Sequence, residues 1–327
     1  MRLWLRLTRI VAALLITAGL AGAAQAEPLR IGHSTYVGYG PLFVAQEKGF
    51  FTKQGADVDM ITIEDVHARI AALEAGQIDA IAVTADTMVR FLNPDGELYR
   101  CMLVLSDSLG ADGIVASKDI QSIADLEGKV VAFEEGEVSQ FYLNVLLKEA
   151  GLSQDNIEVV GLTAEDASNA FLLQEVDAAV TWEPWLTEGK QAEHGHLLTD
   201  SSDRPGLIID VVFTTPSVLD ARRDEFAALA HAWFEAVDYV QANPDEAREI
   251  MARGVGGWLE DSAVFAEALA GVRFYDSDRM QEYFGTADQP GPIYPTLQAA
   301  IDVWSDLGML EVEVSPADLV ARGVWTD

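Results

Sequence analysis

Cysteine is nearly absent from this sequence of 327 residues, since Cys101 is the only one. A single cysteine excludes an internal disulfide, so packing must stabilise the fold. Its place beside an apolar run predicts a buried structural thiol. No cysteine stands directly after the apolar N-terminal stretch, so we expect no lipid attachment there. His194 and His196 have no third ligand nearby, which favours a surface loop, and we expect no bound metal and no cofactor.

Positive charge is scarce as well: 21 lysines and arginines stand against 53 aspartates and glutamates, a formal charge of −32. Without the three arginines of residues 1–26 the charge is −35. This acidity argues against nucleic acid and anionic membrane surfaces as partners. It identifies no ligand, because salt screens it over roughly 10 Å. A solvated surface, as in a protein from a saline habitat, is the favoured explanation of the acidity.

Long apolar runs are missing after residue 26. The first 26 residues have a basic start, the apolar stretch IVAALLITAGLAGAA, and then Ala24-Gln25-Ala26, the small-x-small pattern cleaved by signal peptidase. The stretch is too short for a comfortable membrane span. We therefore predict a signal peptide, residues 1–26, cleaved after Ala26, and a mature protein that is free in the periplasm without direct membrane insertion.

Short apolar runs alternate with helical patterns along the rest of the chain. Strands are predicted at LRIGHS, VDMITI, IDAIAVT, CMLVLS, GIVAS, KVVAFEE, IEVVGLT, VDAAVTW and LIIDVVFTT, with helices such as PLFVAQEKG and SQFYLNVLLKEAG between them. This alternation predicts an α/β fold with parallel sheets and helices on both faces. From about residue 221 the chain becomes mostly helical, and FAALAHAWFEAVDYVQANP predicts a long amphipathic helix.

A weak internal repeat links residues 77–84 with residues 175–181. In each copy, helical residues lead to an Ile-Asp-Ala or Val-Asp-Ala step, an apolar strand and a threonine. The match can arise by chance, but it suggests two similar lobes. Open α/β sheets bind ligands at the carboxyl ends of their strands. The predicted binding regions are therefore 84–87 in the first copy and 181–185 in the second.

Two strand-end loops precede helices. In HSTYVGYGP, Tyr36 and Tyr39 offer aromatic faces and hydroxyls, and Gly38 and Gly40 allow the backbone to approach a ligand; an ordinary turn with core tyrosines is the alternative. In KVVAFEEGEVSQF, residues 135–139 surround the next helix start, where capping explains one of the acidic residues.

The strand-end loops are acidic. Loops 33–41, 84–88, 106–113, 134–140, 181–187 and 206–213 hold no lysine or arginine, but they contain Asp86, Asp107, Asp112, Glu134, Glu135, Glu137, Glu183 and Asp210. In AVTWEPWL, two indoles flank a glutamate, and an indole attracts a cation by about 0.5–2 kcal/mol. This favours a pocket for an amine or other cationic group over a packed corner of the core.

Asp210 lies inside an apolar run, and a buried carboxylate needs a partner. A structural hydrogen bond and a ligand contact remain equally open. The candidate ligand-binding residues are Tyr36, Tyr39, Asp86, Asp112, Glu135, Ser139, Trp182, Glu183, Trp185 and Asp210.

The chain resembles the periplasmic solute-binding proteins of ABC importers in the nitrate, sulfonate and taurine class. The resemblance covers essentially all of the chain after residue 26. It rests on YGPLFVAQEKGFF, ARIAALEAGQIDA, GADGIVASKDIQSIADLEGKVVAFEEG, NAFLLQEVDAAVTWEPWL and AWFEAVDYVQANPDEA. The long central match is specific to the class and not to one solute.

The resemblance implies a two-lobed, type II-like fold with two crossover hinge segments, near 106–113 and 210–215. Lobe 1 is then discontinuous, 27–109 and 213–327, and lobe 2 is 110–212. It also implies a monomer that closes on a small solute and presents it to a membrane permease with its ATPase. Relatives that bind simple anions use polar and basic groups, so the acidic loops here indicate an amine-bearing solute, cationic or zwitterionic, such as a taurine-like amino-sulfonate.

Three alternatives remain at this point: a binder of a simple sulfonate or nitrate-type anion, a binder of a thiamine-pyrimidine precursor, and an enzyme on the same fold. Pyrimidine-precursor synthases of this fold carry a cysteine- and histidine-rich stretch, which a chain with one cysteine lacks. No Gly-rich phosphate loop, G-x-S-x-G elbow or triad-like spacing is present either. We therefore expect no catalytic residues and no enzyme activity.

Overall fold

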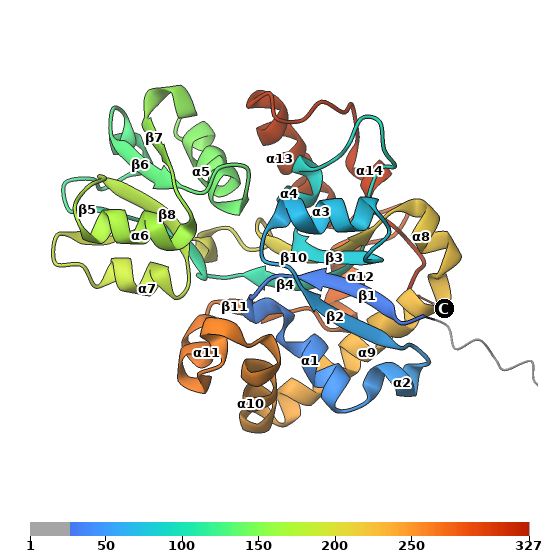
Figure 1. The fold of residues 1–327 in the computed structure, drawn as a ribbon. Helices are drawn as coiled ribbons and strands as arrows, with labels where there is room; N and C mark the ends of the chain where they lie inside the picture. The colour runs from blue at the N-terminus through green and yellow to red at the C-terminus, as the bar shows by residue number, and fades with distance from the viewer. Residues whose placement is uncertain (1–26, 327) are drawn as a thin grey trace, which may run out of the picture.

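A computed structural model describes residues 27–326 of the chain, and the predicted signal peptide lies outside them. Two sheets organise the described residues, side by side in Figure 1. One has the strand order β11-β4-β10-β3-β1-β2 and the other β7-β6-β8-β5-β9. We call the first sheet with its helices lobe 1 and the second sheet with its helices lobe 2.

The strands of lobe 1 are β1 (Leu29–His33), β2 (Val58–Thr62), β3 (Ala80–Thr84), β4 (Arg100–Ser108), β10 (Ile209–Thr214) and β11 (Val272–Phe274). Those of lobe 2 are β5 (Asp112–Ser117), β6 (Val130–Phe133), β7 (Glu158–Gly161), β8 (Ala178–Trp182) and β9 (Gly195–Asp200). Each apolar run that the sequence predicts to be a strand forms one in the structure, and β9 and β11 are strands that were not predicted.

The helices of lobe 1 are α1 (Gly40–Glu47), α2 (Phe50–Gln54), α3 (Val66–Glu74), α4 (Ala85–Arg90), α8 (Pro216–Ala221), α9 (Arg223–Ala242), α10 (Pro244–Val255), α11 (Ser262–Leu269), α12 (Ser277–Phe284), α13 (Ile293–Asp306) and α14 (Pro316–Leu319). Those of lobe 2 are α5 (Val138–Glu149), α6 (Ala164–Leu172) and α7 (Trp185–Lys190). Short 3₁₀ turns are η1 (Val37–Tyr39), η2 (Ile123–Leu126), η3 (Gln154–Asn156), η4 (Ser201–Asp203) and η5 (Gly257–Leu259). The predicted helical C-terminal region is confirmed.

The sheets are mixed, so the prediction of parallel sheets holds only for part of each sheet. The β1, β2 and β3 strands are parallel, but β10 runs antiparallel to both β3 and β4. In lobe 2, β5 likewise runs antiparallel to β8 and β9. The reason is topological: β5 and β10 are the strands on which the chain enters each lobe from the other one, so they start at the edge where the parallel strands end.

The internal repeat is present in the structure. The Asp79 carboxylate accepts the Arg30 backbone N–H at 2.8 Å, and the Asp177 carboxylate accepts the Val130 backbone N–H at 2.9 Å. In both lobes the aspartate thus joins the start of the third strand of one unit to the start of its first. The strand orders also correspond, β4-β10-β3-β1-β2 to β9-β5-β8-β6-β7. The two lobes therefore place equivalent strand ends toward each other.

Matching helices also begin alike. Asp65 accepts the Ala68 N–H at 2.7 Å and caps α3, while Thr163 accepts the Asp166 N–H at 3.2 Å and caps α6. An N-cap of this kind satisfies a backbone donor that the helix leaves free.

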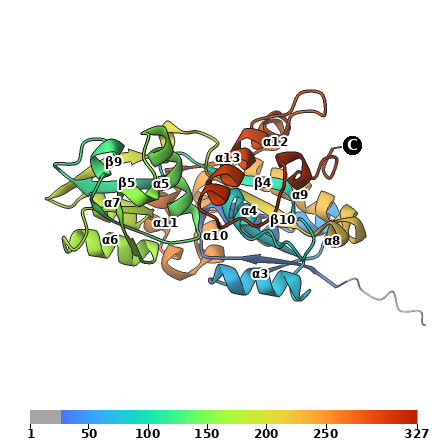
Figure 2. The same cartoon turned by 90° about the horizontal axis from the view of Figure 1, so that it is seen from above.

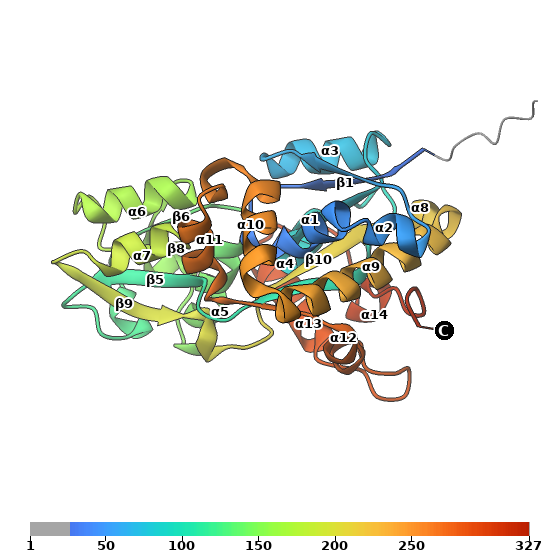
Figure 3. The same ribbon diagram turned by 90° about the horizontal axis from the view of Figure 1, so that it is seen from below.

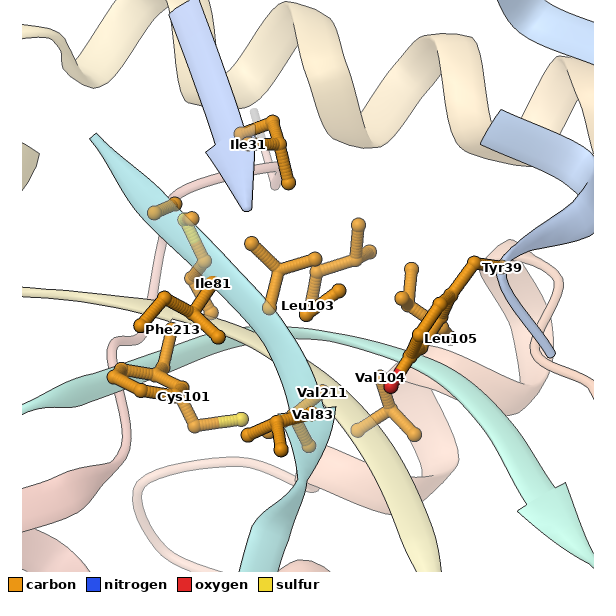
Figure 4. Packing of buried hydrophobic residues seen from close by; sticks show 14 of the residues in the cluster. Ile31, Tyr39, Ile81, Val83, Cys101, Leu103, Val104, Leu105, Val211 and Phe213 are labelled. Atoms are coloured by element: carbon orange, nitrogen blue, oxygen red, sulfur yellow. The ribbon is translucent and has the colours of Figure 1, made fainter. Parts of the chain in front are cut away.

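Lobe 1 has the larger core. In Figure 1, α3, α4 and α13 lie above its sheet and α1, α2 and α9 below it. Cys101 on β4 is fully buried beside Phe213 and other apolar side chains of the sheet (Figure 4). Burial raises the pKa of its thiol to about 12, so it is a structural thiol as the sequence predicts.

Two segments connect the lobes, residues 109–111 and residues 201–208. Ser201 ties them together, because its hydroxyl bonds with the Ser108 hydroxyl at 2.7 Å and accepts the Gly110 N–H at 2.7 Å. The second crossover predicted at 210–215 is wrong in position: those residues belong to β10 or follow it, in the middle of the lobe 1 sheet. The boundaries of the lobes as folding units stay a prediction.

Among residues 27–326, no helix combines the length and the apolar character that crossing a bilayer requires.

Candidate ligand-binding site

A cavity of about 80 Å³ lies between the lobes. It is lined by Ser34, Thr35, Tyr36, Tyr39, Arg69, Val83, Thr84, Asp112, Glu137, Val138, Trp182, Ile208 and Asp210. The lining residues come from both lobes, and most of them follow the carboxyl end of a parallel strand or begin the strand paired with it. The rule for ligand sites in open α/β sheets therefore places this cavity correctly.

Strand pairing brings the two central aspartates to the cavity. Asp210 is the second residue of β10 and lies opposite Thr84, the last residue of β3. Asp112 begins β5 and lies opposite Trp182, the last residue of β8. Both aspartates are thus set at the same strand-end level by antiparallel partners, one in each lobe.

Asp210 is held in a defined position. Its carboxylate accepts the Tyr39 hydroxyl at 3.2 Å and the Ser106 hydroxyl at 2.8 Å. A Cβ atom on Gly38 would collide with Ser106, and one on Gly40 with Met251. The two glycines therefore allow close packing of protein against protein, and not the approach to a ligand that the sequence suggested.

Burial makes the acids of the cavity weak. It raises the pKa of Asp112 to about 6, and the charge of Glu183 adds to this effect. It raises the pKa of Asp210 to about 7, with a contribution from the charges of Asp112 and Asp86. It also raises the pKa of Glu137 to about 7. Asp210 and Glu137 therefore retain protons up to about pH 7, and Asp112 up to about pH 6.

The unliganded protein should therefore lose stability as the pH rises. A carboxyl group with a raised folded-state pKa binds protons more tightly folded than unfolded, so its effect is absent below pH ~4 and fully unfavourable above its folded pKa. Asp210 titrates near pH 7 in the fold. We expect Asp210→Asn to melt about 2–4 °C above the wild type at pH 8, with a smaller gap at pH 5. An equal gap at both pH values would contradict this, in thermal melts without ligand.

Of the three residues singled out in AVTWEPWL, only Trp182 lies in the cavity lining. It lines the cavity and meets Tyr36 of lobe 1 edge to face, with ring centroids 6.5 Å apart. The indole of Trp185 is not in the lining and packs on Trp182 at 4.3 Å. The Glu183 carboxylate accepts the Thr187 N–H and pairs with Lys190, each at 3.0 Å. The sequence AVTWEPWL is therefore a cavity wall at Trp182 and a packed corner at the other two residues.

Three further predicted residues lie outside the lining. Glu135 is exposed and lies against Gly161 at the end of β7. Ser139 is buried in the first turn of α5, and Asp86 is buried in the first turn of α4. Burial raises the pKa of Asp86 to about 7, with a smaller effect from Asp112. Asp86 thus acts on the cavity through its charge and is not a lining residue.

Arg69 is the main residue that the sequence reasoning missed. It lies on α3, outside the six strand-end loops, and its side chain lines the cavity. The strand-end loops hold no basic residue, but the cavity does, because Arg69 reaches it from a helix. Helical spacing could have revealed it, because Arg69 lies three residues after Val66 and four before Leu73, on the buried face of the helix.

Glu137 and three hydroxyl residues, Ser34, Thr35 and Thr84, are the other polar groups of the lining that the candidate set lacks. Glu137 is the N-cap residue of α5, yet its side chain makes no capping hydrogen bond. Its carboxylate is therefore left free for the cavity, which a capping pattern in the sequence does not reveal.

Trp258 closes the aromatic cluster from lobe 1. It lies in η5 between α10 and α11, the segment that reaches lobe 2 beside α7 and β8 in Figure 3. Its ring centroid is 5.9 Å from that of Trp182 and 5.3 Å from that of Trp185. On another side, α13 lies beside α5 (Figure 2), and Lys148 pairs with Asp306 at 2.8 Å. These contacts join the lobes around the cavity in addition to the contact of Tyr36 with Trp182.

The two histidines of the 194–196 segment bind separate carbonyls. His194 bonds with the Phe171 carbonyl at 2.9 Å and His196 with the Ile120 carbonyl at 2.7 Å. In the described part of the chain, no three His, Cys, Asp or Glu side chains are grouped so that they could hold a metal ion.

Known proteins share this architecture. The structure matches that of the periplasmic aliphatic sulphonate binding protein SsuA from Escherichia coli with a TM-score of 0.72 at 18% identity, over 91% of this chain and 99% of that chain. The fold is thus that of the periplasmic binding proteins. The sequence model of the NMT1/THI5-like family matches residues 37–247, more than half of the chain, and the chain belongs to this family.

Two curated relatives agree with this assignment. A Brucella abortus protein that is named as a binding protein, with no ligand in its name, is 25% identical over 308 residues, 91% of this chain and 92% of its own. The taurine-binding periplasmic protein of Escherichia coli is 26% identical over 240 residues, 69% of this chain and 70% of its own. The resemblance found in the sequence is confirmed at the level of family and fold.

Proposed function

We propose that this protein is the periplasmic solute-binding component of an ABC importer. It binds a small amine-bearing solute, cationic or zwitterionic and taurine-like, between its two lobes and presents it to a membrane permease. Cleavage after Ala26 releases it into the periplasm, and it binds its solute without turnover. Support for this comes from the family, the fold and the name of the taurine-binding relative.

One observation supports an amine-bearing solute, namely that three carboxyl groups and an indole line one small cavity. Asp112, Asp210 and Glu137 surround it, and Trp182 forms part of the wall. An ammonium group would ionise these weak acids and gain charge-assisted hydrogen bonds that are about twice as strong as neutral ones. The indole face adds a cation–π contact of about 0.5–2 kcal/mol.

Closure of the lobes is the proposed mechanism. A solute that contacts Asp210 from lobe 1 and Asp112 from lobe 2 stabilises the closed form over the open one. It shifts that equilibrium only by its difference in affinity for the two forms. The contact of Trp258 with Trp182 and Trp185 favours the same closed form without touching the solute.

We therefore expect Trp258→Ala to weaken solute binding about tenfold, because aromatic pairs contribute about 0.5–1.5 kcal/mol beyond their buried area. Small-angle scattering should show a more open unliganded protein. Trp233→Phe is the control, since Trp233 is buried in α9 of lobe 1, outside the cavity lining, and donates to the Tyr275 carbonyl. If the affinity of Trp258→Ala is unchanged, the aromatic cluster does not stabilise the closed form.

A thermal-shift and calorimetric screen tests the function directly. The panel contains amines, guanidinium compounds, amino-sulfonates, simple sulfonates and nitrate, each assayed for binding and for turnover. Saturable binding of an amine-bearing member without turnover supports the proposal. If only nitrate and sulfonates without an amine bind tightly, the proposal of an amine-bearing solute is wrong. If a compound is turned over, the proposal of a binding role without catalysis is wrong.

A simple anion is the second candidate, and Arg69 favours it. A guanidinium in the cavity suits sulfonate, carboxylate or nitrate oxygens. The acids in the same cavity oppose a solute that carries negative charge alone, because each would have to be protonated or moved away.

A further inference from the structure

Arg69 is a buried basic residue in the wall of the cavity. Its side chain comes from α3 in lobe 1, is 3% exposed and lines the cavity. The guanidinium atoms Nε and Nη1 have no hydrogen-bond partner in the part of the chain that the structure describes. A buried charge without hydrogen bonds is costly, so a position of this kind is kept only where something else completes it.

The solute is the group that can complete it. Arg69 lines the cavity, and the planar fork of N–H donors in a guanidinium matches the paired oxygens of a carboxylate or sulfonate. Ser34 adds a hydroxyl group to the same lining, whereas the Thr35 and Thr84 hydroxyls donate to Glu64 and Thr87. Asp210 and Asp112 lie in that lining as well, and both are acceptors for an amine.

We propose that the solute is a zwitterion whose anionic group binds the Arg69 guanidinium while its amine binds Asp210 and Asp112. This rests on the proposed function and narrows it, because a plain amine would leave Arg69 bare and a plain anion would leave the two aspartates unpaired. A cavity of about 80 Å³ limits the solute to a short chain between its two charged groups.

Glu137 offers the competing explanation. It lines the cavity from lobe 2, and the charge of Arg69 opposes the rise of its pKa that burial causes, so the two side chains could form an ion pair when the lobes close. In that case Arg69 would assist closure on every solute alike. A solute contact predicts something different, namely an effect confined to solutes that carry an anionic group.

Matched triplets of probes distinguish a contact of Arg69 with the solute from an ion pair of Arg69 with Glu137. Calorimetry on the mature protein compares 2-aminoethanesulfonate with ethylamine and ethanesulfonate, and 3-aminopropanoate with propylamine and propanoate. The same titrations use Arg69→Met, Arg69→Lys and, as the control for an internal pair, Glu137→Gln. We expect a zwitterion to bind wild type at least 100-fold more tightly than its two fragments, and Arg69→Met to lose about 100-fold for the zwitterion but less than threefold for the amine fragment. Arg69→Lys should recover part of the loss.

Three results would overturn the inference. If the amine fragment binds wild type as tightly as its zwitterion, the anionic group contributes nothing to binding. The proposed function, binding of an amine-bearing solute, is then unaffected. Equal losses for zwitterion and amine in Arg69→Met, matched in Glu137→Gln, assign Arg69 to the internal pair. Binding of the sulfonate or carboxylate fragments alone rejects both the zwitterion and the amine-bearing solute of the proposed function. Binding of no member of these short-chain triplets rejects the short zwitterion as the solute. The wild-type titrations decide whether the solute is a zwitterion even if Arg69→Met fails to fold, and Arg69→Lys and Glu137→Gln then test the role of Arg69.

Discussion

Asp210→Asn is expected to weaken binding of the amine-bearing solute about 100-fold at pH 8. The carboxylate lies in the cavity, and the Tyr39 and Ser106 hydroxyls hold it there. Asparagine keeps the shape and an acceptor oxygen but removes the negative charge, and losing one partner of a buried charge pair costs about 2–5 kcal/mol. Isothermal titration with the best solute of the screen measures the effect.

Glu135→Gln is the matched control for this substitution. Glu135 is also an acidic strand-end residue, but it is exposed and lies against Gly161 outside the cavity lining. Its neutral variant should bind within twofold of wild type. Equal effects of the two substitutions would mean that the general negative charge of the protein, and not the placement of Asp210, attracts the solute.

Solute affinity is expected to rise about 100-fold between pH 5 and pH 8. Burial raises the pKa of Asp210 to about 7 and that of Asp112 to about 6. An ammonium group binds the ionised carboxylates, and about one molecule in a hundred has Asp210 ionised at pH 5 if its pKa is 7. Binding therefore requires proton release at low pH and becomes stronger as these groups ionise.

The groups that face the two aspartates decide the size of this effect. Asp86 and Glu137 are weak acids beside them, and Arg69 is the positive group of the lining. Titrations in buffers of different ionisation enthalpy count the protons released. Asp210→Asn should flatten the profile, and its affinity at pH 8 should resemble that of wild type at pH 5. A wild-type affinity that is constant from pH 5 to pH 8 would show that the carboxyl groups are ionised before the solute arrives.

The sequence alone was sufficient for the local elements. The apolar runs that became β1 to β8 and β10 are short, β-branched and bounded by turns, and such patterns depend on neighbours along the chain. The paired aspartates at 79 and 177 marked the two related lobes, since each makes the same backbone hydrogen bond in its own lobe. Because ligand sites follow the carboxyl ends of strands, the sequence pattern also pointed to five residues of the cavity lining, Tyr36, Tyr39, Asp112, Trp182 and Asp210.

Only the tertiary structure decided which charges meet. Glu135, Glu137 and Glu183 look alike in the sequence, yet one is exposed, one lines the cavity and one pairs with Lys190. Arg69 enters the cavity from a helix that no strand-end rule examines. The directions of β5 and β10 follow from the route of the chain between lobes. These features depend on contacts between segments far apart in the chain, and the local pattern of residues does not record them.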